Sequence, residues 1–284
     1  MIEAATEVHE AARRRAESAA ELAGVTVRMP HELPELEQIA ALCNKVWRPD
    51  PTMPVVTVEW LRVLAHVDNY VAAAYRGEQM VGATVAFFGP PNTRSLHSHV
   101  TGVLPDGQIR GVGFALKTHQ RAWALDIGVR TIGWTFDPLV SRNAHFNLAK
   151  LGARGRVYLE SFYGDMPDEL NAGDESDRLL VEWDLADPTV ARALDGNPAE
   201  RAPEALVALD IAGDERPVPG EIKGRYVEVR IPSDIYAVRK ARPETALRWR
   251  LAVRDVLGGL LADGAVITGF SREGGYLLDR GEDA

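Results

Sequence analysis

The chain of 284 residues contains a single cysteine, Cys43, so it cannot form an intrachain disulfide or a metal site made of several cysteines. We expect Cys43 to be a buried thiol. No apolar run approaches the roughly 20 residues that span a bilayer, so we expect no membrane partner. The first 23 residues place glutamates among alanines, and Arg13–Arg15 lie mid-segment, unlike a secretory signal. These features favour a cytoplasmic protein.

An excess of basic residues is also missing. Lys and Arg total 32, Asp and Glu total 41, and the net charge is −9. This balance argues against a general nucleic-acid binder and against a protein that binds membranes through a basic surface. Apolar residues make up 46% of the chain and charged residues 26%, as in ordinary globular proteins, so disorder of the whole chain is excluded.

Apolar spacing predicts an α+β fold. Periodicities of three to four residues indicate helices over 2–23, 31–47, 57–67, 114–127, 141–150 and 243–262. Alternating or β-branched runs indicate strands over 25–29, 69–75, 80–88, 95–104, 131–136, 155–163, 178–185, 226–231, 265–270 and 275–278. Short Gly- and Pro-containing turns between the early strands predict a central, mostly antiparallel sheet flanked by helices. The last helix is expected to turn Leu247, Leu251, Val256 and Leu260 inward.

The composition shifts once along the chain, where residues 186–220 hold five prolines. This segment is typical of a linker that contains one short helix or strand. We therefore predict an N-terminal helix (1–24), a core (25–185), a linker (186–224) and a C-terminal α/β extension (225–284). The extension either shapes an acceptor pocket or forms a homodimer interface.

The most informative motif is the stretch Gln108, Ile109, Arg110, Gly111, Val112 and Gly113, between a predicted strand and a predicted helix. Two glycines let the backbone approach a ligand closely, and a helix N-terminus attracts a pyrophosphate. An ordinary glycine-rich turn explains the same residues. A dinucleotide-binding turn fits less well, because it needs a small residue where Leu116 stands and a parallel strand–helix–strand unit.

The stretch resembles the acyl-CoA loop, Q/R-x-x-G-x-G/A, of the GNAT superfamily of N-acetyltransferases. The predicted element order over 25–185, the strand ending Thr101–Leu104, and the pair Asn143-Ala144 before Leu151-Gly152-Ala153 are similar to that family. The resemblance implies acetyl-CoA or another acyl-CoA as co-substrate, with no metal. It assigns the pantetheine arm to Val103, Leu104 and Asn143, and the pyrophosphate to 108–113. Asn143 is alternatively a helix cap.

Further residues resemble a subgroup of predicted acetyltransferases with a C-terminal extension. They are Trp134–Leu139, Asn143-Ala144, Tyr163–Asp165, Asp177-Arg178, Trp249-Arg250 with Arg254, and Gly275–Leu278. Some members of that subgroup are associated with N-succinyl-amino-acid metabolism, which implies acyl groups larger than acetyl.

Direct attack of an amine on a thioester needs a base for the amine and an acid for the leaving thiolate. The resemblance places the base eleven residues before Gln108, at His97, and the period of a strand puts His99 on the same face. The acid of the family is a helix tyrosine, but Leu148 stands at that position. Substitutes are His145, Asn147, Tyr158 and Tyr163, of which Tyr163 is our catalytic candidate; the thiolate can also leave without an acid.

Two kinds of acceptor contact are expected. Asp137 either holds the ammonium of the acceptor or caps the turn before Pro138. Arg142, Arg178 and Arg250 are able to bind a carboxylate on the acceptor or on a succinyl group, although each is more simply read as a solvated surface residue.

The expected function is N-acylation of a small amine, such as an amino acid, by acetyl-CoA or a larger acyl-CoA. Residues 107–125 contain Arg110, Lys117 and Arg121 but no carboxylate, a locally positive window around the phosphate loop. Two alternatives stay open: a non-catalytic acyl-CoA-binding regulatory module, and a protein lysine acetyltransferase.

Overall fold

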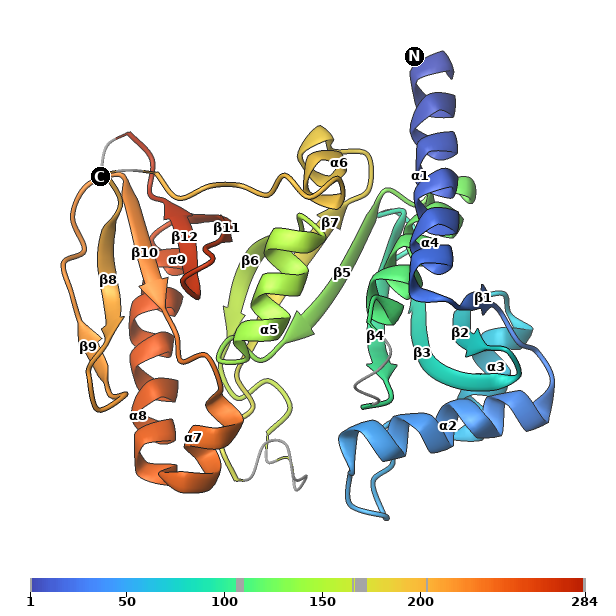
Figure 1. The fold of residues 1–284 in the computed structure, drawn as a ribbon, viewed down its shortest axis with the longest axis horizontal. Coiled ribbons are helices and arrows are strands. Elements are labelled where there is room, and N and C mark those ends of the chain that lie inside the picture. The colour runs from blue at the N-terminus through green and yellow to red at the C-terminus, as the bar shows by residue number, and fades with distance from the viewer. Residues whose placement is uncertain (1, 106–109, 165, 167–172, 203, 283–284) are drawn as a thin grey trace. The chain divides into compact units, whose positions relative to one another are not determined.

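The computed structural model describes residues 2–105, 110–164, 166, 173–202 and 204–282, with side chains from residue 6 onward. The chain forms two compact units, Met1–Ile132 and Gly133–Ala284. Each unit contains both strands and helices (Figure 1). The unit boundary falls inside the strand β5 (Thr131–Phe136).

The first unit is built on an antiparallel meander in the order β1-β2-β3-β4. Its strands are β1 (Thr26–Arg28), β2 (Tyr70–Arg76), β3 (Gln79–Phe88) and β4 (Ser95–Val103). One face carries α1 (Ile2–Ala23) and α4 (Val112–Asp126), which lie side by side (Figure 1). The other face carries α2 (Leu33–Trp47) and α3 (Val58–His66). Alternate strand residues supply the two cores, as a half-buried antiparallel sheet requires.

Local sequence explains how α2 and α3 are placed. The Thr57 side chain accepts a hydrogen bond from the Trp60 backbone N–H at 3.2 Å, so Thr57 caps α3 as its sequence position predicts. At the end of β4, a Cβ on Gly102 would lie 2.6 Å from the Trp47 ring. Glycine at this position therefore lets α2 approach the strand closely.

The second unit holds β5, β6 (Arg154–Leu159) and β7 (Arg178–Asp184) in the order β5-β7-β6, and a further sheet. The order of the further sheet is β11-β12-β10-β8-β9, with mixed pairing, from β8 (Leu206–Ile211), β9 (Pro217–Pro219), β10 (Tyr226–Arg230), β11 (Val266–Phe270) and β12 (Gly275–Asp279). The helices are α5 (Ser141–Ala144), α6 (Pro188–Leu194), α7 (Ile235–Ala241), α8 (Pro243–Val253) and α9 (Gly259–Ala262). Two π-helical segments, His145–Lys150 and Arg254–Gly258, continue α5 and α8.

The α+β class, the mostly antiparallel sheet and the element order over 25–185 are confirmed. The C-terminal α/β extension is present as a second sheet with helices. The segment 186–224 contains α6, β8 and β9 rather than one short element, and the sequence reasoning missed α7. Cys43 is buried, as expected.

The buried face of α8 was predicted wrongly. Leu247 and Leu251 are 48% and 42% exposed, whereas Ala246, Trp249, Arg250 and Val253 are buried. Apolar periodicity assigns leucines to the core, but here an arginine is buried because carboxylates elsewhere in the unit neutralise it.

Across the described residues, no helix has the length and apolar character needed to cross a membrane. The same residues contain no group of three or more His, Cys, Asp or Glu side chains that could hold a metal ion.

Candidate functional site

Two histidines share one face of β4. Strand pairing runs Val85 with Val100 and then Ala86 with Ser98, so a β-bulge leaves His99 without a direct partner on β3. The ring centroids of His97 and His99 lie 6.4 Å apart, and both rings contact Phe87, at 5.2 and 6.2 Å. The structure thus brings the two predicted base candidates together. A bulge redirects side chains and is frequent next to active sites.

The two histidines differ in their partners. The His99 ring packs edge-on against Trp60, with centroids 5.4 Å apart, and hydrogen-bonds to the backbone of Val55. His97 has no hydrogen-bond partner among the residues that the structure describes. Burial lowers the pKa of both histidines, and the charges of His99 and Lys117 lower the pKa of His97 further. Both rings are therefore neutral near pH 7, the form that accepts a proton.

The candidate phosphate loop leads into α4. Gly111 is the N-cap of α4 at φ 89°, a left-handed conformation that a side chain would strain. Arg110 is exposed, and the first turn of α4 has no acidic residue. A helix begins with N–H groups that lack intrahelical acceptors, so this end of α4 suits an anion. Gln108 and Ile109, which the motif also names, lie outside the described residues.

Residues preceding the loop are placed by β3. Val103 ends β4 opposite Gly82, and the Leu104 N–H donates to the Val81 carbonyl at 2.9 Å. The side chains of Val103 and Leu104 pack into the cores on opposite faces of the meander. Val112 is buried at the start of α4, and Gly113 is half-buried beside it.

The positive window around the loop is smaller than the sequence suggested. Arg110 is exposed, but Lys117 and Arg121 are buried. Lys117 Nζ donates to Gln120 Oε1 at 2.6 Å and to Ser98 Oγ at 3.2 Å, and burial lowers its pKa to about 7. The reason is that α4 is enclosed along most of its surface, so of these three basic residues only Arg110, which precedes the N-cap, is exposed.

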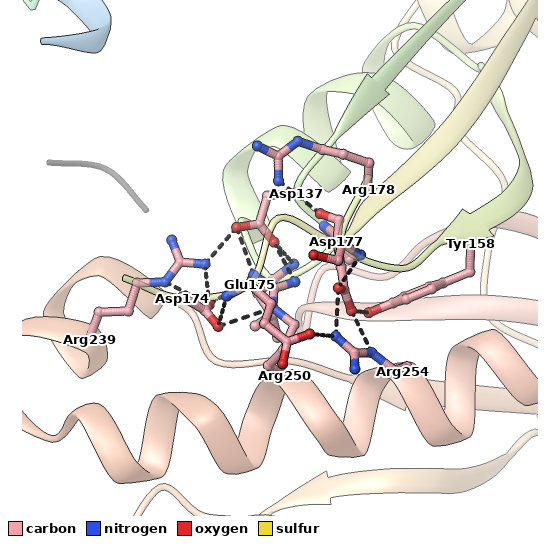
Figure 2. Close-up of polar contacts among 12 residues, drawn as sticks. Asp137, Tyr158, Asp174, Glu175, Asp177, Arg178, Arg239, Arg250 and Arg254 are labelled. Atoms are coloured by element: carbon pink, nitrogen blue, oxygen red, sulfur yellow. Dashed lines mark hydrogen bonds and ion pairs between the residues drawn. The ribbon is translucent and has the colours of Figure 1, made fainter. Parts of the chain in front are cut away.

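In the second unit, Asp137 joins a buried ion cluster (Figure 2). Arg250, fully buried, donates to both oxygens of Asp137 at 3.0 and 3.1 Å and to Asp174 at 2.9 Å. Arg239 donates to the same two carboxylates, at 2.6 Å to Asp137 and 2.8 Å to Asp174. Burial would raise the pKa of Asp137, but Arg250 and Arg239 outweigh burial and lower it to about 2.

Asp137 also caps its own turn, because its Oδ1 accepts a hydrogen bond from the Leu139 N–H at 2.9 Å. Turn capping was one of the two roles expected for Asp137, and the other, holding an acceptor ammonium, stays a prediction. Arg250 and Arg178 were expected as solvated surface residues, which is wrong for both, since both are buried.

A second ion group adjoins the first along β6 and β7. Arg254 donates to both oxygens of Asp177 at 2.7 and 2.9 Å and also pairs with Glu175. The Tyr158 hydroxyl donates to Asp177 at 2.7 Å, and burial together with this carboxylate raises the pKa of Tyr158. Tyr158 is therefore already engaged as a donor.

The remaining candidates lie in the same unit. The Tyr163 side chain is 43% exposed, and its hydroxyl lies 3.2 Å from Thr135 Oγ1. Leu148, at the position of the family's tyrosine, is buried. Asn143 is half-buried on α5, whose N-cap is Val140 with no side-chain cap bond, so Asn143 does not cap this helix.

Residues that resemble the subgroup, although far apart in the chain, converge here. Asp137 and Arg250 are 113 positions apart, and the Tyr276 hydroxyl donates to the Pro138 carbonyl at 2.6 Å. Sequence reasoning missed Asp174 and Arg239, the other half of the ion cluster. No local pattern marks either one, because their role depends on contacts across 65 positions or more.

No protein-family model and no curated protein matches the chain. Solved structures that are similar to it include diaminobutyrate acetyltransferase from Paenibacillus lautus, in complex with its substrate and coenzyme A (18% identity, 57% of this chain, 95% of that chain, TM-score 0.44). A second is a ribosomal-protein-alanine N-acetyltransferase from Brucella melitensis (17% identity, 55% of this chain, 98% of that chain, TM-score 0.46). A third is a GNAT-family acetyltransferase from Streptococcus pneumoniae (14% identity, 56% of this chain, 97% of that chain, TM-score 0.46). These structures are acetyltransferases, one of them named as a GNAT-family member, to which the chain is similar over 55–57% of its length.

Proposed function

We propose that the protein is an N-acyltransferase that moves an acetyl or larger acyl group, succinyl included, from acyl-CoA to the amine of a small metabolite such as an amino acid. One observation carries the proposal. In a single unit, a strand that carries two neutral histidines on one face leads through a glycine N-cap into the buried helix α4. A proton acceptor and an anion-binding helix end therefore follow each other in the chain.

The donor fits the N-terminus of α4. A pyrophosphate bound there accepts hydrogen bonds from backbone N–H groups and lies at the positive end of the helix dipole. Gly111 removes the side chain that would oppose the close approach of the backbone, and the exposed Arg110 adds a cation beside it. The pantetheine arm is assigned to the backbone of Val103 and Leu104 and to Asn143 on the basis of the sequence resemblance.

The proposed reaction forms a C–N bond and breaks the thioester C–S bond. The neutral amine attacks the carbonyl carbon, His97 takes the proton that the amine loses, and the CoA thiolate leaves. His97 is preferred over His99 because the Val55 hydrogen bond already uses one ring nitrogen of His99. Tyr163 is our candidate to protonate the thiolate, since the Tyr158 hydroxyl is committed to Asp177.

The test has two parts. Calorimetry measures the binding of acetyl-CoA and succinyl-CoA, and a thiol reagent measures CoA release with a panel of amines. We expect binding of at least one acyl-CoA and CoA release that depends on an amine. Absence of binding at millimolar acyl-CoA would refute the proposal.

A non-catalytic acyl-CoA-binding module is a second candidate, because a buried leucine, Leu148, replaces the family's tyrosine. His97→Ala separates the two functions. Acyl-CoA binding without turnover in the wild-type protein supports the module, whereas turnover that falls more than about tenfold in His97→Ala with binding retained supports the enzyme.

A further inference from the structure

The buried ion cluster of the second unit balances its own charges. Asp137 and Asp174 carry two negative charges, and Arg239 and Arg250 carry two positive ones. Each of these arginines contacts both carboxylates. The guanidinium of Arg250 is therefore occupied within the protein, which removes it from the arginines that could bind a substrate.

Arg178 differs from these arginines. It begins β7, is only 8% exposed, and has no carboxylate within ion-pair distance among the described residues. Its Nη1 donates to the Asp177 carbonyl at 2.9 Å, and its Nη2 donates to the thioether sulfur of Met166 at 3.1 Å. In Figure 2, no dashed line joins its guanidinium to any of the carboxylates drawn. A guanidinium has more N–H donors than these two bonds use, and a thioether is a weak acceptor.

Burying such a cation without an anion is costly, so an anion from outside the chain would be bound strongly. Burial lowers the pKa of Arg178, and the charges of Arg250 and Arg239 lower it further, although Asp137 and Tyr163 act in the opposite direction. Because Arg178 has no ion-pair partner among the described residues, the fitting ligand is a monoanion. A carboxylate matches the planar donor edge of a guanidinium in two parallel hydrogen bonds.

One aromatic ring, that of Tyr163, lies against Arg178, and Tyr236 lies close enough to feel its charge. The guanidinium carbon of Arg178 lies 5.1 Å from the Tyr163 ring centroid. The charges of Arg142 and Arg178 lower the pKa of Tyr236 on α7, which burial raises. The Arg142 guanidinium carbon lies 5.8 Å from the centroid of the Tyr236 ring. The half-exposed Tyr163 therefore borders the buried cation, and the exposed Arg142 lies over the ring of Tyr236.

We propose that Arg178, with the Tyr163 ring against it, binds a carboxylate of the substrate, so that the reaction favours a carboxylate-bearing reactant. The inference rests on the proposed acyl transfer. The carboxylate belongs either to the amine acceptor, as in an amino acid, or to a dicarboxylic acyl chain such as succinyl.

The test pairs substrates that differ only in the carboxylate. Acceptors are α-amino acids, each with its carboxamide and its decarboxylated amine, and donors are acetyl-CoA and succinyl-CoA. The variants are Arg178→Gln and Arg178→Lys, and Arg156→Gln is the control, because Arg156 is half-exposed and pairs with Glu182 on the neighbouring strand. Circular dichroism confirms that each variant is folded.

We expect the wild-type protein to prefer the carboxylate-bearing reactant by about 10- to 100-fold in kcat/KM, the value of a charge-assisted pair. Arg178→Gln loses this preference through a higher KM for the carboxylate-bearing reactant, Arg178→Lys is intermediate, and the control Arg156→Gln keeps the preference. A preference for amino acids over their carboxamides and decarboxylated amines shows that Arg178 binds the acceptor carboxylate. A preference for succinyl-CoA over acetyl-CoA shows that it binds the carboxylate of the acyl chain. An equal loss on all reactants, or no wild-type preference, overturns the proposal.

Thermal unfolding separates this inference from the proposed function. N-acetyl amino acids, which carry the acceptor carboxylate, and succinate, which carries the carboxylate of the acyl chain, are added separately to the wild-type protein and to Arg178→Gln without any acyl-CoA. A Tm increase in the wild-type protein alone supports the subsite even where no amine is acylated, in which case the proposed function fails and the subsite stands. If the wild-type Tm does not rise, or rises equally in Arg178→Gln, the subsite is refuted.

Discussion

Replacing Asp137 with asparagine tests the buried ion cluster. The asparagine side chain would keep an oxygen for the Leu139 N–H, but it would remove the negative charge and place an NH2 donor where Oδ2 accepts hydrogen bonds from Arg239 and Arg250. The two arginines would then have only Asp174 as their shared carboxylate. The pKa of Asp137 falls from 3.8 to about 2 in the folded protein. That difference corresponds to about 2 kcal/mol of stability in favour of the ionised form. We expect Asp137→Asn to lower the free energy of unfolding by about 2–3 kcal/mol at pH 7.

The sign of the pH dependence follows from the lowered pKa. The contribution of Asp137 is complete above its unfolded pKa of 3.8 and is lost as the pH falls through about 2. Asparagine does not titrate. The difference in free energy of unfolding between the wild-type protein and Asp137→Asn should therefore be smaller at pH 3 than at pH 7, by about 1 kcal/mol.

The assay is urea unfolding followed by tryptophan fluorescence, for which the fully buried Trp249 on α8 is a local probe. Asp214→Asn is the control, because Asp214 pairs with Arg216 on the surface and this variant should unfold like the wild-type protein. The reasoning is refuted if Asp137→Asn is as stable as the wild-type protein, or if the gap is the same at pH 7 and pH 3. A stable Asp137→Asn variant with a raised KM for amines would instead show that Asp137 holds the acceptor ammonium.

Three further predictions concern the first unit. His97→Gln should lower kcat by about 100-fold or more with acyl-CoA affinity unchanged, and equal kcat values for this variant and the wild-type protein would exclude His97 as the base. The wild-type kcat/KM should fall at a pH below 6.5, because burial and the charges of neighbouring residues lower the pKa of His97. Gly111→Ala should weaken acyl-CoA binding, whereas Gly128→Ala, which strains a left-handed glycine at the other end of α4, should not; equal affinities in calorimetry would contradict the loop assignment. Cys43 should react with a thiol reagent only on unfolding, since burial raises its pKa to about 12, and rapid labelling of the native protein would disprove this.

Most of the fold is predictable from local patterns. Strands β1 to β4 alternate or end at Gly and Pro turns, and the Thr57 cap and the Gly24 stop define helix ends without any tertiary information. The position of His97 and His99 on one face of β4 also follows from the period of a strand, although the register shift between β3 and β4 beside them does not.

The ion cluster was not predictable for a physical reason. A buried arginine has the same local sequence as a solvated one, and only its distant carboxylates distinguish the two states. Arg250 therefore looked like a surface residue, and the leucines beside it on α8 looked like core. The same limit hid Asp174 and Arg239, whose partners come from other elements of the fold.

Transfer of an isotopic label tests the central claim most directly. The protein is incubated with ¹³C-acetyl-CoA and a panel of amino acids, and the products are measured by mass spectrometry. We predict a labelled N-acetyl product and an equal amount of free CoA, both greatly reduced in His97→Gln. Release of CoA without any labelled N-acetyl product would contradict the proposed function. So would the absence of both acyl-CoA binding and turnover.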